Sequence, residues 1–96
     1  MQNKELEYMN TVNWTQFIIE FREEQNEFIK TLSNYYPTLS KTEFKLCCLI
    51  RSGFTTNEIA KLTNRTVRSV ESVKYRVRKK LPITTHEDLS VFLMRI

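Results

Sequence analysis

The side chains best able to do chemistry are concentrated between residues 65 and 80. Seven Lys or Arg stand there against one acid, Glu71. Residues 1–60 carry a net charge of −2 and residues 61–96 a net charge of +6, although the whole chain is only +4. Cations bind anionic groups, and a distribution this one-sided indicates a polyanionic partner.

The sequence offers little for catalysis or metal binding. His86 is the single histidine, and the two cysteines, Cys47 and Cys48, are adjacent. Neighbouring side chains on a helix point about 100° apart, so this pair does not converge on one metal ion. The chain also has no Gly-rich phosphate loop. We therefore expect no catalytic residue, no metal and no cofactor, and two free thiols in a reduced cytoplasm.

The basic segment must lie on a helix that faces two environments. At 100° per residue, the range 66–81 gathers Val67, Val70, Val73, Val77 and Leu81 in one narrow arc. The opposite arc holds polar and charged side chains: Arg68, Glu71, Ser72, Tyr75, Arg76 and Lys79. One face is therefore suited to a core, and the other to hydrogen bonds with base edges and phosphates.

Capping patterns predict two helices just before this one. Ser40 is followed three residues later by Glu43, and Thr55 is followed by Glu58 in the same way, as in a capping box. Gly53 stands where the first of these helices ends. The sequence predicts helices within 38–53 and from about 56 to 63, with Thr66 capping the basic helix and Pro82 ending it.

The flanks complete an all-α chain of about five helices. We expect a disordered tail or linker over 1–12 and one long amphipathic helix over 13–36, capped by Asn13, because its aromatic and aliphatic residues recur at three- and four-residue spacing. A short last helix is expected to begin near Thr85, with Asp88 three residues on. Residues 38–96 would form the domain, with a tri-helical helix-turn-helix core.

Several motifs in register resemble one known family. They are Leu39-Ser40-Lys41-Thr42-Glu43, Gly53-Phe54-Thr55-Thr56-Asn57-Glu58-Ile59-Ala60, Ser69-Val70-Glu71 and Arg78-Lys79-Lys80-Leu81. Over 43 residues, 39–81, they align without a gap with the LuxR/GerE (NarL-type) helix-turn-helix. The flanking aromatic residues resemble the C-terminal output segments of larger bacterial sensor-regulators, in which a sensor region precedes the domain.

The resemblance implies roles for individual residues. Base-contacting positions fall on Glu71, Ser72 and Tyr75, and positions near the DNA backbone fall on Thr56, Asn57, Ser69 and Lys74, with Arg76, Arg78 and Lys79 as further candidates. The chain departs from the family at Glu71, where Lys or Arg is common, and at Val73, where His is common. Glu71 either reads a cytosine or pairs with Lys74, Arg68 or Tyr75.

Two further assignments concern Arg68, from its chemistry, and Glu43, from the resemblance. Arg68 is the strongest candidate base reader, because guanidinium binds guanine bidentately and this residue stands near the start of the helix. Glu43 is the family's internal glutamate. We expect its carboxylate to pair with a cation of the basic helix, Lys74 or Arg78.

The function expected from these features is sequence-specific binding of double-stranded DNA by a bacterial transcriptional regulator. Pairing of two copies would use the last helix, through Leu89, Phe92, Leu93 and Ile96, unless these side chains pack inside one monomer. The alternative is a module resembling region 4 of sigma factors, or one that docks a partner protein through the aromatic N-terminal helix. No stretch approaches the ~20 apolar residues of a membrane span, so no membrane contact is expected.

Overall fold

The computed structural model describes residues 14–96, and every element in that range is a helix. The predicted tail over 1–12 and the predicted cap Asn13 lie outside the described residues. Six helices follow one another without an intervening strand in the described part: α2 (Trp14–Glu24), α3 (Asn26–Tyr35), α4 (Lys41–Arg51), α5 (Thr56–Leu62), α6 (Val67–Lys80) and α7 (Leu89–Arg95). The expected all-α class is confirmed, with six helices where about five were predicted.

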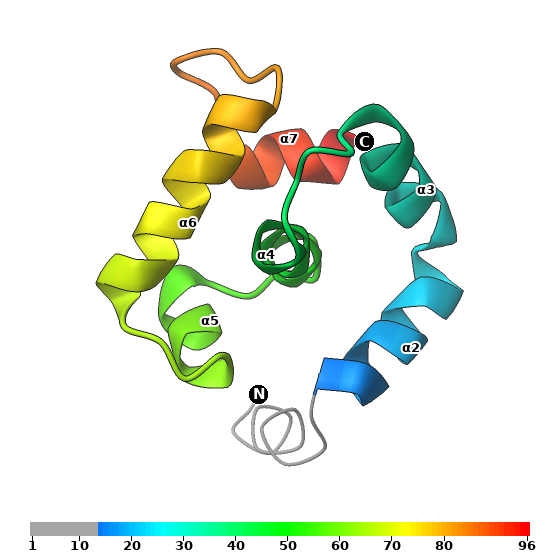
Figure 1. Ribbon diagram of the computed structural model, residues 1–96, viewed down its shortest axis with the longest axis horizontal. Coiled ribbons are helices and arrows are strands. Elements are labelled where there is room, and N and C mark those ends of the chain that lie inside the picture. The colour runs from blue at the N-terminus through cyan, green and yellow to red at the C-terminus, as the bar shows by residue number, and fades with distance from the viewer. Residues whose placement is uncertain (1–13) are drawn as a thin grey trace.

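Helix α4 lies at the centre of the molecule. Figure 1 views it nearly end-on, with α2 and α3 on one side, α5 and α6 on the other, and α7 across one end. Five consecutive residues of α4 are buried, from Leu46 to Ile50. These five residues cover more than one full turn, so the C-terminal half of α4 is buried on all sides, whereas its first turns expose Lys41 and Lys45. Burial raises the pKa of the Cys47 and Cys48 thiols to about 12, and both cysteines are free.

The predicted N-terminal helix is two helices, and this expectation was wrong. The chain leaves helical geometry at Gln25, which has φ −124° and ψ 39°. No proline or glycine stands at the break, so the local sequence does not predict it. The bend brings Phe21 and Phe28 edge to face, with ring centroids 5.9 Å apart, and both are buried. Two short helices can follow the curved surface of the core where one straight rod could not.

The predicted helix boundaries around α4 and α5 are confirmed. Ser40 and Thr55 each form a complete capping box, with Glu43 and Glu58 respectively. At the other end of α4, Gly53 adopts a φ of +97°. Its N–H bonds Ile50 O at 2.9 Å, and Phe54 N–H bonds Leu49 O at 3.2 Å. This is the Schellman ending that glycine favours, because a Cβ resists positive φ.

The two C-terminal helices differ from expectation at their first turns. Val67 was placed in the core arc, but it is 43% exposed, because the first turn of α6 extends beyond the core. The last helix begins at Leu89 and not near Thr85, since Asp88 is itself the N-cap and accepts from Ser90 N–H. The backbone of 84–87 instead supplies carbonyl groups to Arg78.

Candidate nucleic-acid interface

Helices α5 and α6 pack against each other and are joined by a tight turn of four residues, 63–66. Asn64 has a φ of +56° in this turn. Its N–H bonds Lys61 O at 3.3 Å, and Arg65 N–H bonds Ala60 O at 2.8 Å, which closes α5 with a second Schellman motif. Asparagine tolerates the left-handed region better than other residues with a Cβ. The turn therefore forms without glycine, and Thr66 begins α6 by accepting from Ser69 N–H.

The outer face of α6 presents the side chains predicted to read bases. Arg68, Glu71, Ser72 and Tyr75 are all exposed, while Val70, Val73 and Val77 are buried against the core. Nζ of Lys79 lies 4.8 Å from the centroid of the Tyr75 ring. Among the described residues Glu71 takes part in no ion pair, so its pairing with Lys74 or Arg68 is not formed.

Glu43 has different partners from those expected. Its carboxylate lies 2.7 Å from Nζ of Lys80 and 3.4 Å from Nε of Arg76, and it also accepts from Ser40 N–H at 2.8 Å. The predicted pairing with Lys74 or Arg78 is wrong, because the rotation of α6 turns these two cations away from α4. Glu43 is 2% exposed, so the interaction joins α4 to α6 within the fold.

The pKa of Glu43 reflects a balance between burial and these donors. Burial alone would raise the pKa of the carboxyl group, because it disfavours the charged form. The hydrogen bonds from Lys80 and Ser40, the charge of Lys80 and the hydrogen bond from Arg76 act in the opposite sense and outweigh it. The pKa is therefore lowered from its ordinary value of 4.5, and the group is an anion at neutral pH.

Two other cations of α6 also have partners within the molecule. Nζ of Lys74 donates to the hydroxyl of Thr56 at 3.2 Å and so links α6 to α5. Arg78 donates to three carbonyl oxygens of the α6–α7 connection, those of Glu87 at 2.8 Å, Thr84 at 3.3 Å and Thr85 at 3.4 Å. These contacts fix the connection after Pro82. They also leave Arg78 less able to reach a phosphate than Lys79, which is exposed.

The structure adds a group of polar side chains that lie outside the main helix prediction, because the helical wheel was drawn for residues 66–81. Asn57, Lys61, Asn64 and Arg65 line a hollow of about 770 Å³ at the α5–α6 turn, beside Val67. Only Asn57 was predicted to contact DNA. Arg65 also donates to the Ser69 hydroxyl at 3.3 Å, which brings these two residues together. Lys61 is on the outer side of a capped amphipathic helix, so a wheel of α5 could have identified it.

The residues expected to pair two copies pack mainly inside this one. Leu89, Phe92 and Leu93 are at most 6% exposed, and Ile96 is half-buried. The Phe92 ring meets the Tyr36 ring with centroids 6.5 Å apart, and Arg51 of α4 donates to Leu93 O. The side chains that α7 does expose are Val91, Met94 and Arg95.

Comparison of the chain with protein-family models, with curated proteins and with solved structures finds no match. Over residues 14–96, no group of three or more His, Cys, Asp or Glu side chains is placed to hold a metal ion. None of the helices in that range is long and apolar enough to cross a membrane.

Proposed function

We propose that the chain binds double-stranded DNA, with α5 and α6 acting as a helix-turn-helix of the LuxR/GerE type and α6 lying in the major groove. The observation that carries the proposal is the outer face of α6. It exposes Arg68, Glu71, Ser72 and Tyr75 on a helix whose opposite face is clamped in the core. A helix of this kind fits the major groove, which is about 12 Å wide, and its side chains match the donors and acceptors of base edges.

Cations beside this face support the proposal. Lys61 and Arg65 lie at the α5–α6 turn, and Lys79 lies towards the other end of α6, so phosphates on either side of a groove would meet positive charge. The neighbouring polar groups Asn57 and Asn64 add hydrogen-bond donors. Phosphate contacts position a protein on the duplex, whereas base contacts give specificity. We assign Lys61, Arg65 and Lys79 to the first role and Arg68 to the second.

The proposal gives the domain the role of an output module in a bacterial transcriptional regulator, with its signal supplied by another region or partner. Pairing of two copies on two half-sites would use Val91 and Met94, the exposed apolar side chains of α7, because Leu89 and Leu93 are buried in one copy. Sedimentation of wild type and Met94→Glu with and without duplex tests this part. A dimer that Met94→Glu does not weaken would contradict it.

The main experiment measures binding of a labelled duplex, chosen by selection from random sequences, as a function of salt. With about three or four phosphate contacts, the logarithm of affinity should fall against the logarithm of salt concentration with a slope of about −3 to −4. Arg68→Ala should lose about 1–3 kcal/mol on the selected site and relax the preference at one base position. Lys61→Ala should weaken all sequences alike and make the slope shallower by about 1.

A matched control removes a cation from the other side of the molecule. Lys30 is exposed on α3, across α4 from α6, and Lys30→Ala should leave the affinity and the salt slope unchanged. Wild type that binds no duplex at low salt would refute the proposal. So would equal losses for Lys30→Ala and Lys61→Ala, because the binding would then follow net charge and not this surface.

A further inference from the structure

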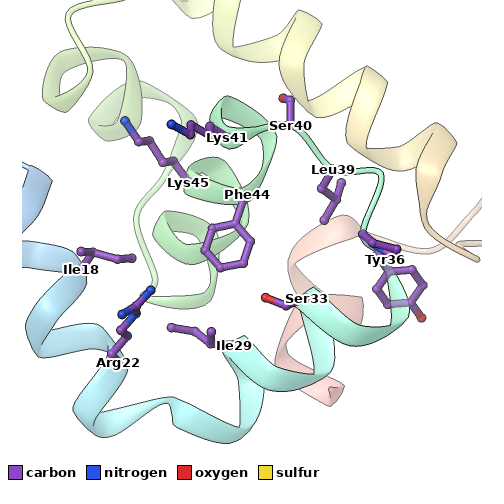
Figure 2. A pocket seen from close by; sticks show the side chains of 11 residues that line it. Ile18, Arg22, Ile29, Ser33, Tyr36, Leu39, Ser40, Lys41, Phe44 and Lys45 are labelled. Carbon is purple, nitrogen blue, oxygen red and sulfur yellow. The ribbon is translucent and has the colours of Figure 1, made fainter.

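A second surface of the molecule combines apolar side chains with positive charge. A groove of about 660 Å³ runs between α2 and α3 on one side and the first turns of α4 on the other, as Figure 2 shows. Ile18, Ile29 and Phe44 line its centre, and Tyr36 and Leu39 line one end. All five are only partly buried, although they pack against the core beneath them. The groove therefore leaves apolar surface in contact with water.

Among the described residues, the charged side chains that line the groove are all of one sign. They are Arg22 from α2 and Lys41 and Lys45 from α4, and no Asp or Glu of residues 14–96 lines it. This contrasts with residues 1–60 as a whole, which are net negative at −2. Within the described range, neither Arg22 nor Lys41 pairs with an acidic side chain. In Figure 2 Arg22 stands across the apolar centre from Lys41 and Lys45, so the cations flank the apolar surface from two helices.

We propose that this groove docks an acidic peptide segment of a partner protein. The apolar side chains of the segment would cover Ile18, Ile29 and Phe44, and its carboxylates would lie between Arg22 and Lys41. Burial of the exposed apolar surface supplies the main driving force, and charge complementarity selects an acidic partner over a basic one. The groove is open to solvent along its side, which suits a length of chain, whereas small-molecule sites enclose most of their ligand.

Helices α2 and α3, which line the groove together with the first turns of α4, lie on the opposite side of α4 from α6 (Figure 1). A segment seated between α2, α3 and α4 would not cover Arg68 or Tyr75, so the surface proposed to bind DNA stays accessible. Binding of the peptide and binding of DNA should therefore be compatible. This also makes the two proposals separable, because each depends on side chains that the other does not use.

The test uses fluorescein-labelled synthetic peptides and the full chain in an anisotropy titration. The first peptide is a short segment of Asp, Leu and Phe, the second replaces its Asp with Lys, and the third replaces its Leu and Phe with Ser. Only the first should bind with saturation at one peptide per chain. The double variant R22E/K41E should weaken it at least about tenfold, because attraction becomes repulsion at two rim positions.

Two controls separate this site from general electrostatic attraction. Lys30→Glu changes the charge of α3 at a position that does not line the groove, and it should leave the peptide affinity within about twofold. Circular dichroism checks that each variant keeps its helices, and addition of duplex DNA should not displace the peptide. Backbone NMR shifts in the wild-type complex should be largest around Ile29 and Phe44, a result that does not depend on any variant folding.

Four results of the peptide titrations and the NMR experiment would overturn the assignment. They are equal binding of the acidic and basic peptides, retention of affinity in R22E/K41E, NMR shifts on α5 and α6 in place of α3 and α4, and displacement of the peptide by a simple fatty acid at equal concentration. Self-association of the chain that R22E/K41E abolishes would also overturn it, because the occupant would then be a second copy.

Discussion

The carboxylate of Glu43 and the ammonium of Lys80 lie 2.7 Å apart, although 37 residues separate them along the chain. The contact joins the first turn of α4 to the last turn of α6, and Lys80 also donates to Thr38 O at 3.0 Å. Because the same carboxylate completes the capping box with Ser40, one side chain both begins α4 and sets the position of α6 beside it. The orientation of the proposed recognition helix thus depends on a buried residue that would not touch DNA.

Replacement of Glu43 by Gln should lower the free energy of unfolding by about 1–3 kcal/mol, since hydrogen bonds to charged groups contribute roughly that much. The loss should stay below the ~3–5 kcal/mol of a fully buried ion pair, because Arg76 and Lys80 remain in contact with water. Urea denaturation measures it. Glu58→Gln is the matched control, since Glu58 forms the same kind of capping box at Thr55 but no ion pair with any residue of 14–96. Equal losses for both variants would contradict the prediction.

The contribution of Glu43 should depend on pH with a defined sign. Its pKa in the folded protein is lowered below the ordinary value of 4.5. A lowered pKa means that the stabilisation is fully present above about pH 4.5 and is lost as the pH falls through the folded pKa. The stability difference between wild type and Glu43→Gln should therefore shrink from neutral pH towards pH 3. Urea titrations across this range check it, and a difference that stays constant would contradict the assignment.

Two adjacent cations of α6 should behave differently when each is replaced by Ala. Arg78→Ala removes three hydrogen bonds to the α6–α7 connection and should cost about 1–2 kcal/mol of stability. Lys79→Ala should cost less than about 0.5 kcal/mol, because the side chain is exposed. Its effect should appear instead as weaker binding of all duplexes. Thermal unfolding and anisotropy, the latter at a temperature where both variants are folded, distinguish these roles. A destabilised Lys79→Ala with unchanged DNA affinity would contradict them.

The two residues with left-handed backbone conformation, Gly53 and Asn64, should respond differently to substitution. A Cβ at Gly53 would meet nothing within 4 Å, so Gly53→Ala tests the backbone alone at φ +97°. It should destabilise the protein by about 1 kcal/mol. Asn64→Gly should stay within about 0.5 kcal/mol of wild type, because glycine accepts the φ of +56° without strain. Urea denaturation of both variants checks the pair, and a neutral Gly53→Ala would show that the turn relaxes.

The sequence predicted the features that depend on a few neighbouring residues. The boxes at Ser40 and Thr55, the cap at Thr66 and the ending at Gly53 are all local, because the bonds that define them span at most five residues. The three- and four-residue spacing of the valines along α6 likewise identified Val70, Val73 and Val77 as core residues. Local patterns are therefore enough for most helix boundaries and for the inner and outer faces of the main helix.

Features that depend on tertiary packing were not predictable in the same way. The break at Gln25 follows from how Phe21 and Phe28 fit the core, and nothing in the local sequence requires it. The partners of Glu43 depend on the rotation of α6 against α4, which the spacing of charges does not specify. Lys61 and Arg65 were missed as candidates for the site because the hollow they line is built from two helices and a turn.

The buried thiols of Cys47 and Cys48 give the chain a built-in chemical reporter of its own opening. Neither side chain is exposed in the folded state, and a pKa of about 12 leaves almost no thiolate at neutral pH. An alkylating reagent can therefore reach them only when α4 leaves the centre of the molecule. The rate of modification in native buffer would follow the population of opened molecules, and it would fall whenever a bound ligand holds the surrounding helices in place.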